Sequence, residues 1–376
     1  MIPYISIYGF LTLLAFAKNF QYSETIVFLV LALFLNLSYT NGIDWTAYQT
    51  NYIYDPTYTR GVEYGYTAIT ILARSLGLNF EVFKFFLLSL DLYLILRFIF
   101  KKSPKPVFAI LILFQTYLLG NFFEPAIRQI QSVVIFLFAL DALRKNNTKK
   151  YILLILFATL FHQSSIVLLS LPLFIKRLNF KISILFMLVL GAVGLQINNA
   201  VLFLVQYGIF SDYSFYLESS YLEGISPSAF NLLKIVIYGI PLYLLRSFRR
   251  TDPTIEILRA LSYMFVIFYC LQFFALIFYR FNHYFFIPYV IYLSYFFQAL
   301  RIPSNKFIII SFYVLIHFIS LIKGITYYSD RDPMKYFPYT NYAVALIVGN
   351  TYSSPEEKIN ARLSSRWAHL TPFLEQ

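Results

Sequence analysis

Ten apolar segments, each bounded by charged or turn-forming residues, limit how this chain can fold more than any other feature of its sequence. A helix that crosses the hydrocarbon core of a bilayer needs about 20 mainly apolar residues. Because 59% of the 376 residues are hydrophobic and 13% are charged, the segments predict an all-α polytopic membrane protein with about ten full transmembrane helices. The segments are residues 3–17, 25–39, 80–100, 107–123, 127–143, 182–198, 231–245, 255–277, 281–300 and 307–325.

Lys and Arg gather in five clusters between these segments, and this distribution predicts the orientation of the chain. Cytoplasmic loops of membrane proteins carry an excess of Lys and Arg, so we expect all five clusters on the cytoplasmic side. Residues 40–59 and 182–233 contain carboxylates but no Lys or Arg, and are expected outside. The net charge of +12 therefore reflects topology, and no nucleic-acid partner is expected. The clusters are Lys101, Lys102 and Lys105; Arg144, Lys145, Lys149 and Lys150; Lys176, Arg177 and Lys181; Arg246, Arg249 and Arg250; and Arg301 with Lys306.

Residues 151–175 lie between two basic clusters, so this stretch must return to the side of the membrane on which it begins. At a rise of about 1.5 Å per residue it is too short for two full crossings. We therefore predict a re-entrant hairpin with its tip at Phe161-His162-Gln163-Ser164. Irregular backbone at membrane depth is tolerated where it is buried in protein or lines a watery cavity.

Two further segments are predicted to lie at the membrane surface. Residues 64–78 are apolar but contain Arg74, which is typical of an interfacial or partly inserted helix. Residues 346–376 are predicted to form a tail outside a transmembrane domain of residues 1–345. Within the tail, Ser354-Pro355-Glu356-Glu357 is typical of a helix start, and an amphipathic helix on the membrane is expected there, with a frayed tail as the alternative.

Two arginines are expected at the outer ends of apolar helices, where each could bind an anion. Arg128 follows Glu124-Pro125 at a helix start, where free N–H groups add to the positive potential of the guanidinium. Arg280 lies among aromatic residues in the predicted outer turn 278–284, where it could stack while gripping a phosphate or carboxylate. The alternatives are an Arg128–Glu124 salt bridge and an arginine that snorkels from an aromatic belt.

Three other ionisable residues are candidates for acid–base chemistry. His162 is expected at the hairpin tip, where an imidazole has a suitable intrinsic pKa for a general base or could donate to a diphosphate. Asp44 and Glu63 bracket the first outer loop, and their aromatic neighbours suit both a base and a carbohydrate-binding surface. Packing or capping roles are the alternatives. Asp91, inside an apolar helix, is expected to be structural, paired with Arg97 or with a polar residue of another helix.

Several kinds of chemistry have no motif in this chain. There is no Asp-x-Asp cluster, no His-x-x-x-His spacing and no Cys/His array, so no metal is expected. Gly-rich phosphate loops and nucleophile elbows are missing too, which argues against ATP-driven transport and acyl-enzyme chemistry. The single cysteine, Cys270, lies in an apolar segment and is expected to be a buried packing residue.

A series of short motifs runs along the chain: Gly42-Ile43-Asp44-Trp45-Thr46-Ala47-Tyr48, Glu63-Tyr64-Gly65, Ile127-Arg128-Gln129, Phe161-His162-Gln163-Ser164, Arg280 with Tyr284, and Pro338-Tyr339-Thr340-Asn341-Tyr342. In their order and spacing, over residues 20–345, these motifs resemble the EpsG family of bacterial polysaccharide polymerases, a Wzy-like group. Each motif alone is weak. The final 25 residues have no counterpart.

The resemblance implies an enzyme similar to glycosyltransferases of the C class. It would polymerise undecaprenyl-diphosphate-linked oligosaccharides into exopolysaccharide, capsule or O-antigen at the outer face of the bacterial cytoplasmic membrane. Arg128 and Arg280 are then expected to stabilise the leaving diphosphate without a metal or other cofactor. Asp44 or His162 is expected to be the base, and Glu63 to orient the acceptor. Gln129, Tyr48, Tyr284 and Tyr339 are expected to contact substrate.

Two other classes of function are compatible with the sequence. A flippase or exporter would move the same lipid-linked sugars, although the unusual charges gather outward here instead of on both sides of a central path. A ligase, like those that attach O-antigen, or an acyltransferase would transfer one finished group and yield no ladder of products. As further protein partners we expect a flippase and a chain-length regulator.

Overall fold

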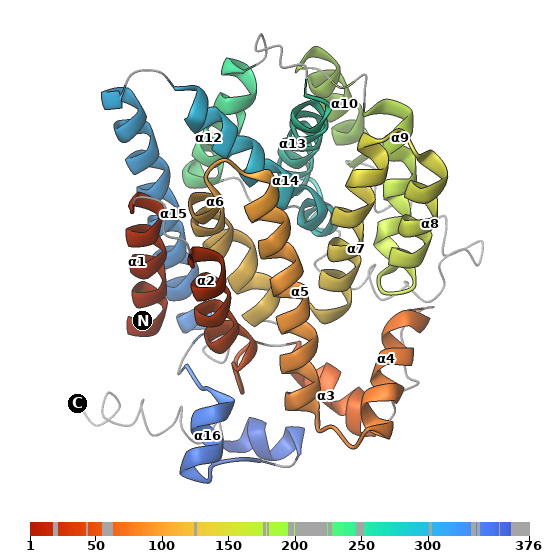
Figure 1. Cartoon of the computed structure of the whole chain (residues 1–376), viewed down its shortest axis with the longest axis vertical. Coiled ribbons are helices and arrows are strands. Elements are labelled where there is room, and N and C mark those ends of the chain that lie inside the picture. The colour runs from red at the N-terminus through yellow and green to blue at the C-terminus, as the bar shows by residue number, and fades with distance from the viewer. Residues whose placement is uncertain are drawn as a thin grey trace.

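The computed structural model of the chain is helical throughout the part that it describes. Figure 1 shows the longer helices running along the long axis of the molecule, with α3, α4 and α16 at its lower end. The described residues are 1–17, 22–42, 44–54, 63–123, 126–175, 178, 180–194, 199, 224, 228–245, 252–300, 303–331, 336, 339–352 and 354–361. The elements are α1 Ile2–Phe16, α2 Ser23–Leu31, η1 Ala32–Asn36, α3 Trp45–Ile53, α4 Tyr64–Ser75, α5 Phe80–Lys102, α6 Pro106–Leu113, η2 Phe114–Phe123, α7 Ile127–Arg144, α8 Thr148–Thr159, η3 Gln163–Ser170, α9 Leu171–Phe174, α10 Phe180–Gly194, α12 Ala229–Leu244, α13 Pro253–Leu271, α14 Ile277–Ala299, α15 Pro303–Arg331 and α16 Tyr342–Val348.

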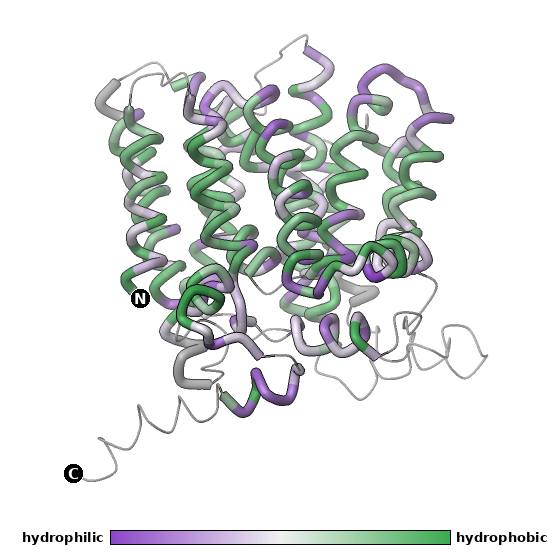
Figure 2. The backbone as a smooth tube through the Cα atoms, turned by 60° about the horizontal axis from the view of Figure 1, so that its bottom comes forward, coloured by the Kyte–Doolittle hydropathy of each residue, from purple (hydrophilic) through white to green (hydrophobic). Residues whose placement is uncertain are grey.

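Three helices among the described residues are long and apolar enough to cross a membrane: Pro106–Phe123, Pro253–Leu271 and Lys306–Thr326. Shorter apolar helices accompany them, including Ile2–Phe16, Ser23–Asn36 and Ala229–Leu244. Figure 2 shows this apolar character as a broad band across the bundle, with hydrophilic residues concentrated towards its ends. These features indicate a membrane protein, and the number of about ten full crossings stays a prediction.

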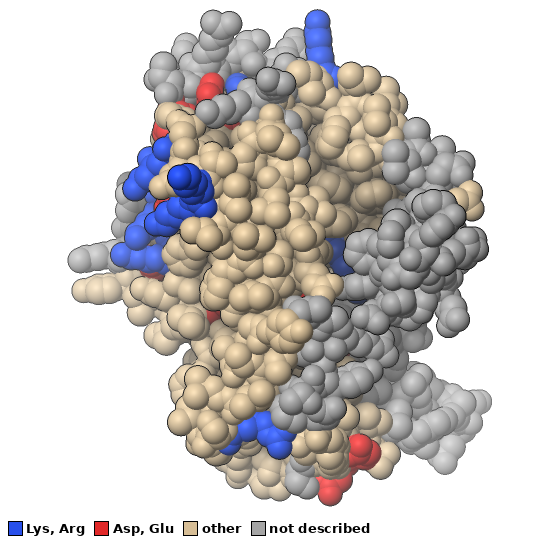
Figure 3. Space-filling view, turned by 90° about the vertical axis from the view of Figure 1, so that its right-hand side faces the viewer, with Lys and Arg blue, Asp and Glu red and all other residues tan. Residues whose placement is uncertain are grey.

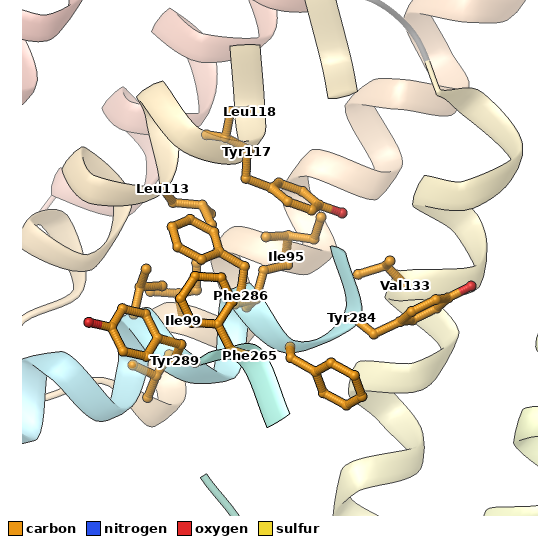
Figure 4. Packing of buried hydrophobic residues seen from close by; sticks show 14 of the residues in the cluster. Ile95, Ile99, Leu113, Tyr117, Leu118, Val133, Phe265, Tyr284, Phe286 and Tyr289 are labelled. Carbon is orange, nitrogen blue, oxygen red and sulfur yellow. The ribbon is translucent and has the colours of Figure 1, made fainter. Parts of the chain in front are cut away.

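Tightly packed aliphatic and aromatic side chains join the central helices (Figure 4). Ile95 and Ile99 of α5, Leu113 of α6 and Phe286 of α14 are all buried in one cluster. The α13–α14 hairpin contributes ring contacts, with the centroids of Phe265 and Tyr289 4.6 Å apart and the rings tilted by 31°. Offset aromatic pairs of this kind add about 0.5–1.5 kcal/mol each beyond the area that they bury. This core holds α7 and α14 in fixed register, and both helices carry residues of the site described below.

Some polar side chains inside the bundle are paired between helices. Asp91 of α5 accepts a hydrogen bond from Gln131 of α7, with Nε2 and Oδ2 3.0 Å apart. Arg97 contacts Glu24 instead, at 3.2 Å. Of the two partners expected for Asp91, the polar residue of another helix is therefore confirmed. An amide between two helices satisfies the buried carboxyl, which would otherwise be costly in an apolar setting.

Basic residues mark one end of the bundle. Lys101 and Lys102 occupy the last turn of α5, and Arg144 occupies the last turn of α7. The C-terminal ends of both helices point towards the upper end in Figure 1, away from α3 and α4. Figure 3 shows Lys and Arg side chains gathered on the upper part of one face, above a wide uncharged zone. The two ends of the molecule therefore differ in charge.

Residues 148–174 form the hairpin that the sequence predicts at this position. Helix α8 ends at Thr159, the chain turns at residues 160–162, and the 3-10 helix η3 runs back beside α8. The hydroxyl of Tyr151 donates to the carbonyl of Leu168 at 2.7 Å, which ties the two arms together. Helix α9 then continues the return towards the basic end (Figure 1). The tip, with His162, consequently lies away from the basic end.

The C-terminal segment begins a helix where the sequence predicts one. Residues 355–361 are helical, and Ser354 forms a reciprocal cap with Glu357: the Ser354 Oγ accepts from the Glu357 amide at 3.1 Å, and the Ser354 amide donates back at 3.3 Å. Lys358 is buried and binds Glu81 of α5 and Gln49 of α3, which anchors the segment beneath them. The predicted amphipathic helix would place Leu363, Trp367 and Leu370 on its membrane-facing side, and these three residues lie outside the described residues. The domain boundary between residues 345 and 346 stays a prediction.

Candidate functional site

A buried carboxylate at the end opposite the basic clusters joins three segments that are distant in sequence. Glu63, with 4% of its surface exposed, accepts from Nη1 of Arg128 at 2.5 Å through one oxygen. Its other oxygen lies 2.9 Å from Nδ1 of His162. Glu63 precedes α4, Arg128 lies in the first turn of α7, and His162 is at the hairpin tip. The site therefore depends on the packing of these three elements.

Gly65 allows α4 to approach the hairpin tip closely enough for this arrangement. Its amide donates to the carbonyl of Leu160 at 2.8 Å. A Cβ at position 65 would lie 3.0 Å from that carbonyl oxygen and 3.0 Å from the ring of Phe161. The absence of a side chain is therefore what lets Glu63 reach His162.

We expect Gly65→Ala to push α4 away from the tip, because the neighbouring backbone oxygen cannot rotate out of the way. Overpacking of this kind costs about 1–3 kcal/mol, and the separated Glu63–His162 pair should lower activity as well. Gly239→Ala is the matched control, since a Cβ at Gly239 in α12 meets no atom within 4 Å. Thermal unfolding of both purified variants tests this. Equal behaviour of the two would contradict the role of Gly65.

The environment of Glu63 keeps its side chain ionised. Burial alone would raise the pKa of this carboxyl, but the hydrogen bond from His162 and the charge of Arg128 outweigh it and hold the pKa below its ordinary value. An ionised Glu63 accepts from the imidazole, so Nδ1 of His162 carries the proton. The other ring nitrogen, Nε2, is buried and has no hydrogen-bond partner among the described residues.

Arg128 has a second contact, and its other donors have no partner among the described residues. Its Nε donates to the hydroxyl of Tyr48 at 3.3 Å, and the guanidinium lies 5.4 Å from the centre of the Tyr48 ring. Its side chain is 29% exposed. Five N–H donors in a fixed fork exceed the two contacts with Glu63 and Tyr48. The remaining donors are positioned to bind an anion.

A second layer of hydrogen bonds joins α7, α14 and the hairpin next to this cluster. Gln129 donates to the backbone carbonyl of Arg280 at 2.7 Å. The hydroxyl of Tyr284 lies 3.1 Å from Oγ of Ser132 and 3.0 Å from Oγ of Ser164. The sequence predicts Gln129 and Tyr284 as site residues but not the two serines as their partners. Ser132 is a polar residue in the predicted apolar segment 127–143, and this polarity is the sequence feature that marks it as a candidate partner.

Arg280 lies in a different local structure from the one predicted. The turn between α13 and α14 comes earlier, at residues 272–276, so Arg280 occupies the first turn of α14 and not an outer turn at 278–284. Helix α14 begins before the aromatic run, because Leu276 already has helical backbone angles and Ile277 is the first residue of the helix. Arg280 remains next to the cluster through its carbonyl contact with Gln129. Its role stays a prediction.

Of the other predicted site residues, Asp44 lies beside Tyr48 at the edge of the cluster, and Tyr339 lies apart from it. Asp44 is exposed at the start of α3, one helical turn before Tyr48. Tyr339 packs on Phe34, with ring centroids 5.0 Å apart, and donates to the Phe34 carbonyl at 2.9 Å. The structure thus brings together Glu63, Arg128, His162, Tyr48, Gln129 and Tyr284. The roles of Asp44 and Tyr339 stay predictions.

Comparison with known proteins identifies the family. The family model of the EpsG family matches residues 22–341 of this chain. The chain belongs to the EpsG family. The match contains every motif on which the sequence resemblance rests except the last residue of the final one, Tyr342. No curated protein matches the chain, and no solved structure matches it.

Family membership points to a membrane protein of polysaccharide biosynthesis. At the level of the EpsG family the expected activity is that of a glycosyltransferase-like polymerase. The apolar helices of the structure agree with a location in a membrane. The residues that carry out the reaction are not assigned by the family match and have to be argued from the geometry above.

Proposed function

We propose that this EpsG protein joins lipid-diphosphate-linked oligosaccharide units into a polysaccharide by metal-independent glycosyl transfer. The observation that carries the proposal is the bridging of Arg128 and His162 by the buried carboxylate of Glu63. Glu63 thereby holds Nε2 of His162 and the remaining donors of Arg128, none of which has a partner among the described residues, on the two sides of its carboxylate. Glycosyl transfer from a diphosphate needs these two functions: a base for the incoming hydroxyl and positive charge for the leaving group.

In this mechanism His162 is the base and Glu63 positions it. The acceptor hydroxyl gives its proton to Nε2 of His162 while its oxygen forms a bond to the anomeric carbon. The bond between that carbon and the diphosphate oxygen breaks, and the diphosphate leaves with the electron pair. Glu63 holds the imidazole through Nδ1 and stabilises the imidazolium that forms, as the carboxylate of a catalytic triad does. The contact between Glu63 and His162 supports His162 over the exposed Asp44 as the base.

The leaving diphosphate is bound by Arg128 and Arg280. Preorganised donors in a site that excludes water stabilise developing charge strongly, since they need no rearrangement during the reaction. Gln129 links the two arginines, because it follows Arg128 in the chain and binds the carbonyl of Arg280. Tyr48, which is partly exposed, offers a ring for stacking against a sugar face. Tyr284 is buried and supports the site through its contacts with Ser132 and Ser164.

The site faces outward from the cytoplasmic membrane in this proposal. The basic ends of α5 and α7 lie opposite to α3 and α4, and basic loops stay in the cytoplasm. The multi-helix architecture with a polar site near one end supports similarity to glycosyltransferases of the C class. The substrates are then oligosaccharide units linked to undecaprenyl diphosphate. A flippase delivers these units, and a chain-length regulator controls the length of the polysaccharide.

Reconstitution of the purified chain in liposomes with lipid-linked repeat units tests the proposal. A ladder of longer glycans is the expected result. Movement of the units across the bilayer without elongation would identify a carrier instead, and a single addition without a ladder would identify a ligase-like transferase. Labelling of single cysteines at positions 44, 128 and 162 in a Cys270-free background tests the orientation. Labelling from the cytoplasmic side alone would contradict an outward site.

A further inference from the structure

Two lysines on separate helices share one aromatic ring at the far side of α14 from the cluster described above. Nζ of Lys234, in α12, lies 5.1 Å from the centre of the Phe230 ring, and Nζ of Lys323, in α15, lies 4.4 Å from it. Neither lysine has a carboxylate partner among the described residues. Two like charges therefore converge on one ring without a counter-ion from the described part of the chain.

Such an arrangement is costly for a membrane protein unless an anion completes it. Lys323 lies in the last turn of the apolar span Lys306–Thr326 and its side chain is exposed, whereas Lys234 is half-buried in an apolar helix. The ammonium group of Lys234 loses hydration, and the two ammonium groups near each other also repel. The Phe230 ring offsets part of this by a cation–π contact, but it carries no net charge. A bound anion would remove the repulsion and replace the lost hydration.

Polar groups without partners lie next to the lysines on the same two helices. Tyr238 lies one turn after Lys234 on the same face of α12, and its buried hydroxyl has no hydrogen-bond partner among the described residues. His317 of α15 is also buried, its Nε2 is likewise without a partner, and its ring centre lies 6.2 Å from that of Tyr238. Buried polar atoms are nearly always hydrogen-bonded in native proteins. These two point to a ligand or water between α12 and α15.

Helix α14 separates this place from the Glu63 cluster and contacts both. Tyr284 of α14 faces Ser132 and Ser164 at the first site. Tyr289, five residues later, donates to the carbonyl of Tyr238 at 3.4 Å. A ligand between α12 and α15 would therefore lie across one helix from the proposed catalytic residues.

We propose that Lys234 and Lys323 bind the diphosphate of a second lipid-linked substrate. This inference rests on the proposed function, because a polymerase that takes both its growing chain and its incoming unit on lipid diphosphates must hold two such headgroups at once. Arg128 and Arg280 hold the diphosphate that leaves. The lysine pair holds the diphosphate that stays attached to the acceptor and needs no charge stabilisation in the transition state. Lysines suit this second role, since they bind phosphate as point charges without the fixed fork of arginine.

Counting bound lipids on the full chain by native mass spectrometry tests the proposal without requiring turnover. The probe is undecaprenyl diphosphate. We expect two bound molecules on the unmodified protein and one on Lys234→Gln/Lys323→Gln, with at least about a tenfold loss of affinity for the second lipid, as removal of charge-assisted contacts predicts. Lys306→Gln, on the same helix α15 but near the basic end, is the matched control and should still bind two. The charge-conserving pair Lys234→Arg/Lys323→Arg should restore binding of the second molecule.

A single variant and a lipid competition experiment separate loss of the second lipid site from misfolding and from binding of ordinary bilayer lipids. Lys323→Gln alone changes an exposed side chain, so a weakened second site in this variant cannot be attributed to misfolding. Two bound diphosphate lipids on the double glutamine variant would overturn the inference while leaving the proposed function intact. Displacement of the second molecule by phosphatidylglycerol at equal concentration would also overturn it, because the pair would then bind ordinary bilayer lipids. Failure of Arg128→Ala to affect elongation would instead contradict the proposed function.

Discussion

Replacing Arg128 with alanine should lower the rate of chain elongation by about a thousandfold. Removal of one preorganised donor to a developing anion costs about 10²–10³ in rate, and Arg128 supplies several donors to the leaving diphosphate in the proposed mechanism. The substitution also releases Glu63 from its contact at 2.5 Å, which disturbs the position of His162. The measurement is the rate of ladder formation in liposomes that contain equal amounts of inserted protein.

The stability of this variant has to be separated from its chemistry. Removing one partner of a buried ion pair costs about 3–5 kcal/mol, because the other charge stays buried without compensation. Arg128→Ala/Glu63→Gln removes both charges and should therefore unfold at a higher temperature than Arg128→Ala while remaining inactive. Arg128→Lys keeps the charge but loses the fork and should keep little activity. Elongation by folded Arg128→Ala within tenfold of the unmodified rate would contradict the assignment of Arg128.

Replacing His162 with alanine should lower elongation by about 10²–10⁴, the usual contribution of a positioned general base. The imidazole has a buried nitrogen without a hydrogen-bond partner among the described residues, so no neighbour can take its place. Asp44→Asn is the matched comparison, because Asp44 is the alternative base from the sequence and lies exposed at the start of α3. Its activity should stay within about tenfold of the unmodified protein, since substitutions of exposed side chains usually have small effects.

The dependence of rate on pH distinguishes a base from a packing residue. A general base makes the rate fall as the pH drops through its pKa, and this limb should vanish in His162→Ala along with most of the rate. Glu63→Gln keeps the imidazole but removes the carboxylate that holds it through Nδ1, so this variant should be slower and should still show the limb. A large loss of rate in Asp44→Asn with normal activity in His162→Ala would reverse the assignment.

Glu63 couples the two halves of the reaction through its two oxygens. In the free protein it contacts Arg128 and His162 at the same time. A bound diphosphate competes with the carboxylate for the guanidinium, so binding of the donor should leave more of the negative charge of Glu63 facing His162. Binding of the donor and positioning of the base are thereby linked through one side chain.

Local patterns in the sequence were sufficient for the elements of the fold near the site. The helix after Ser354 and the partner of Asp91 are confirmed, and residues 148–174 form a hairpin with His162 at its turn. The helix and the hairpin rest on short-range information, such as a capping pattern or a stretch too short for its flanking charges, whereas the sequence left the partner of Asp91 open between Arg97 and a polar residue of another helix. The sequence did not predict the local structure around Arg280, because aromatic residues occur both in turns at the membrane surface and in helix starts.

The sequence by itself determined that this chain is a helical membrane protein and that a polar turn interrupts residues 151–175. Apolar length and the placement of charge decide both, since a bilayer tolerates few alternatives. Only the tertiary structure decided that Glu63 binds Arg128 and His162, which are 65 and 99 residues away along the chain. The periodicity of apolar residues does not predict which side chains Glu63 contacts. That choice depends on the close approach of Gly65 to the tip and on the packing of α7 against the hairpin, and these are contacts of the folded chain.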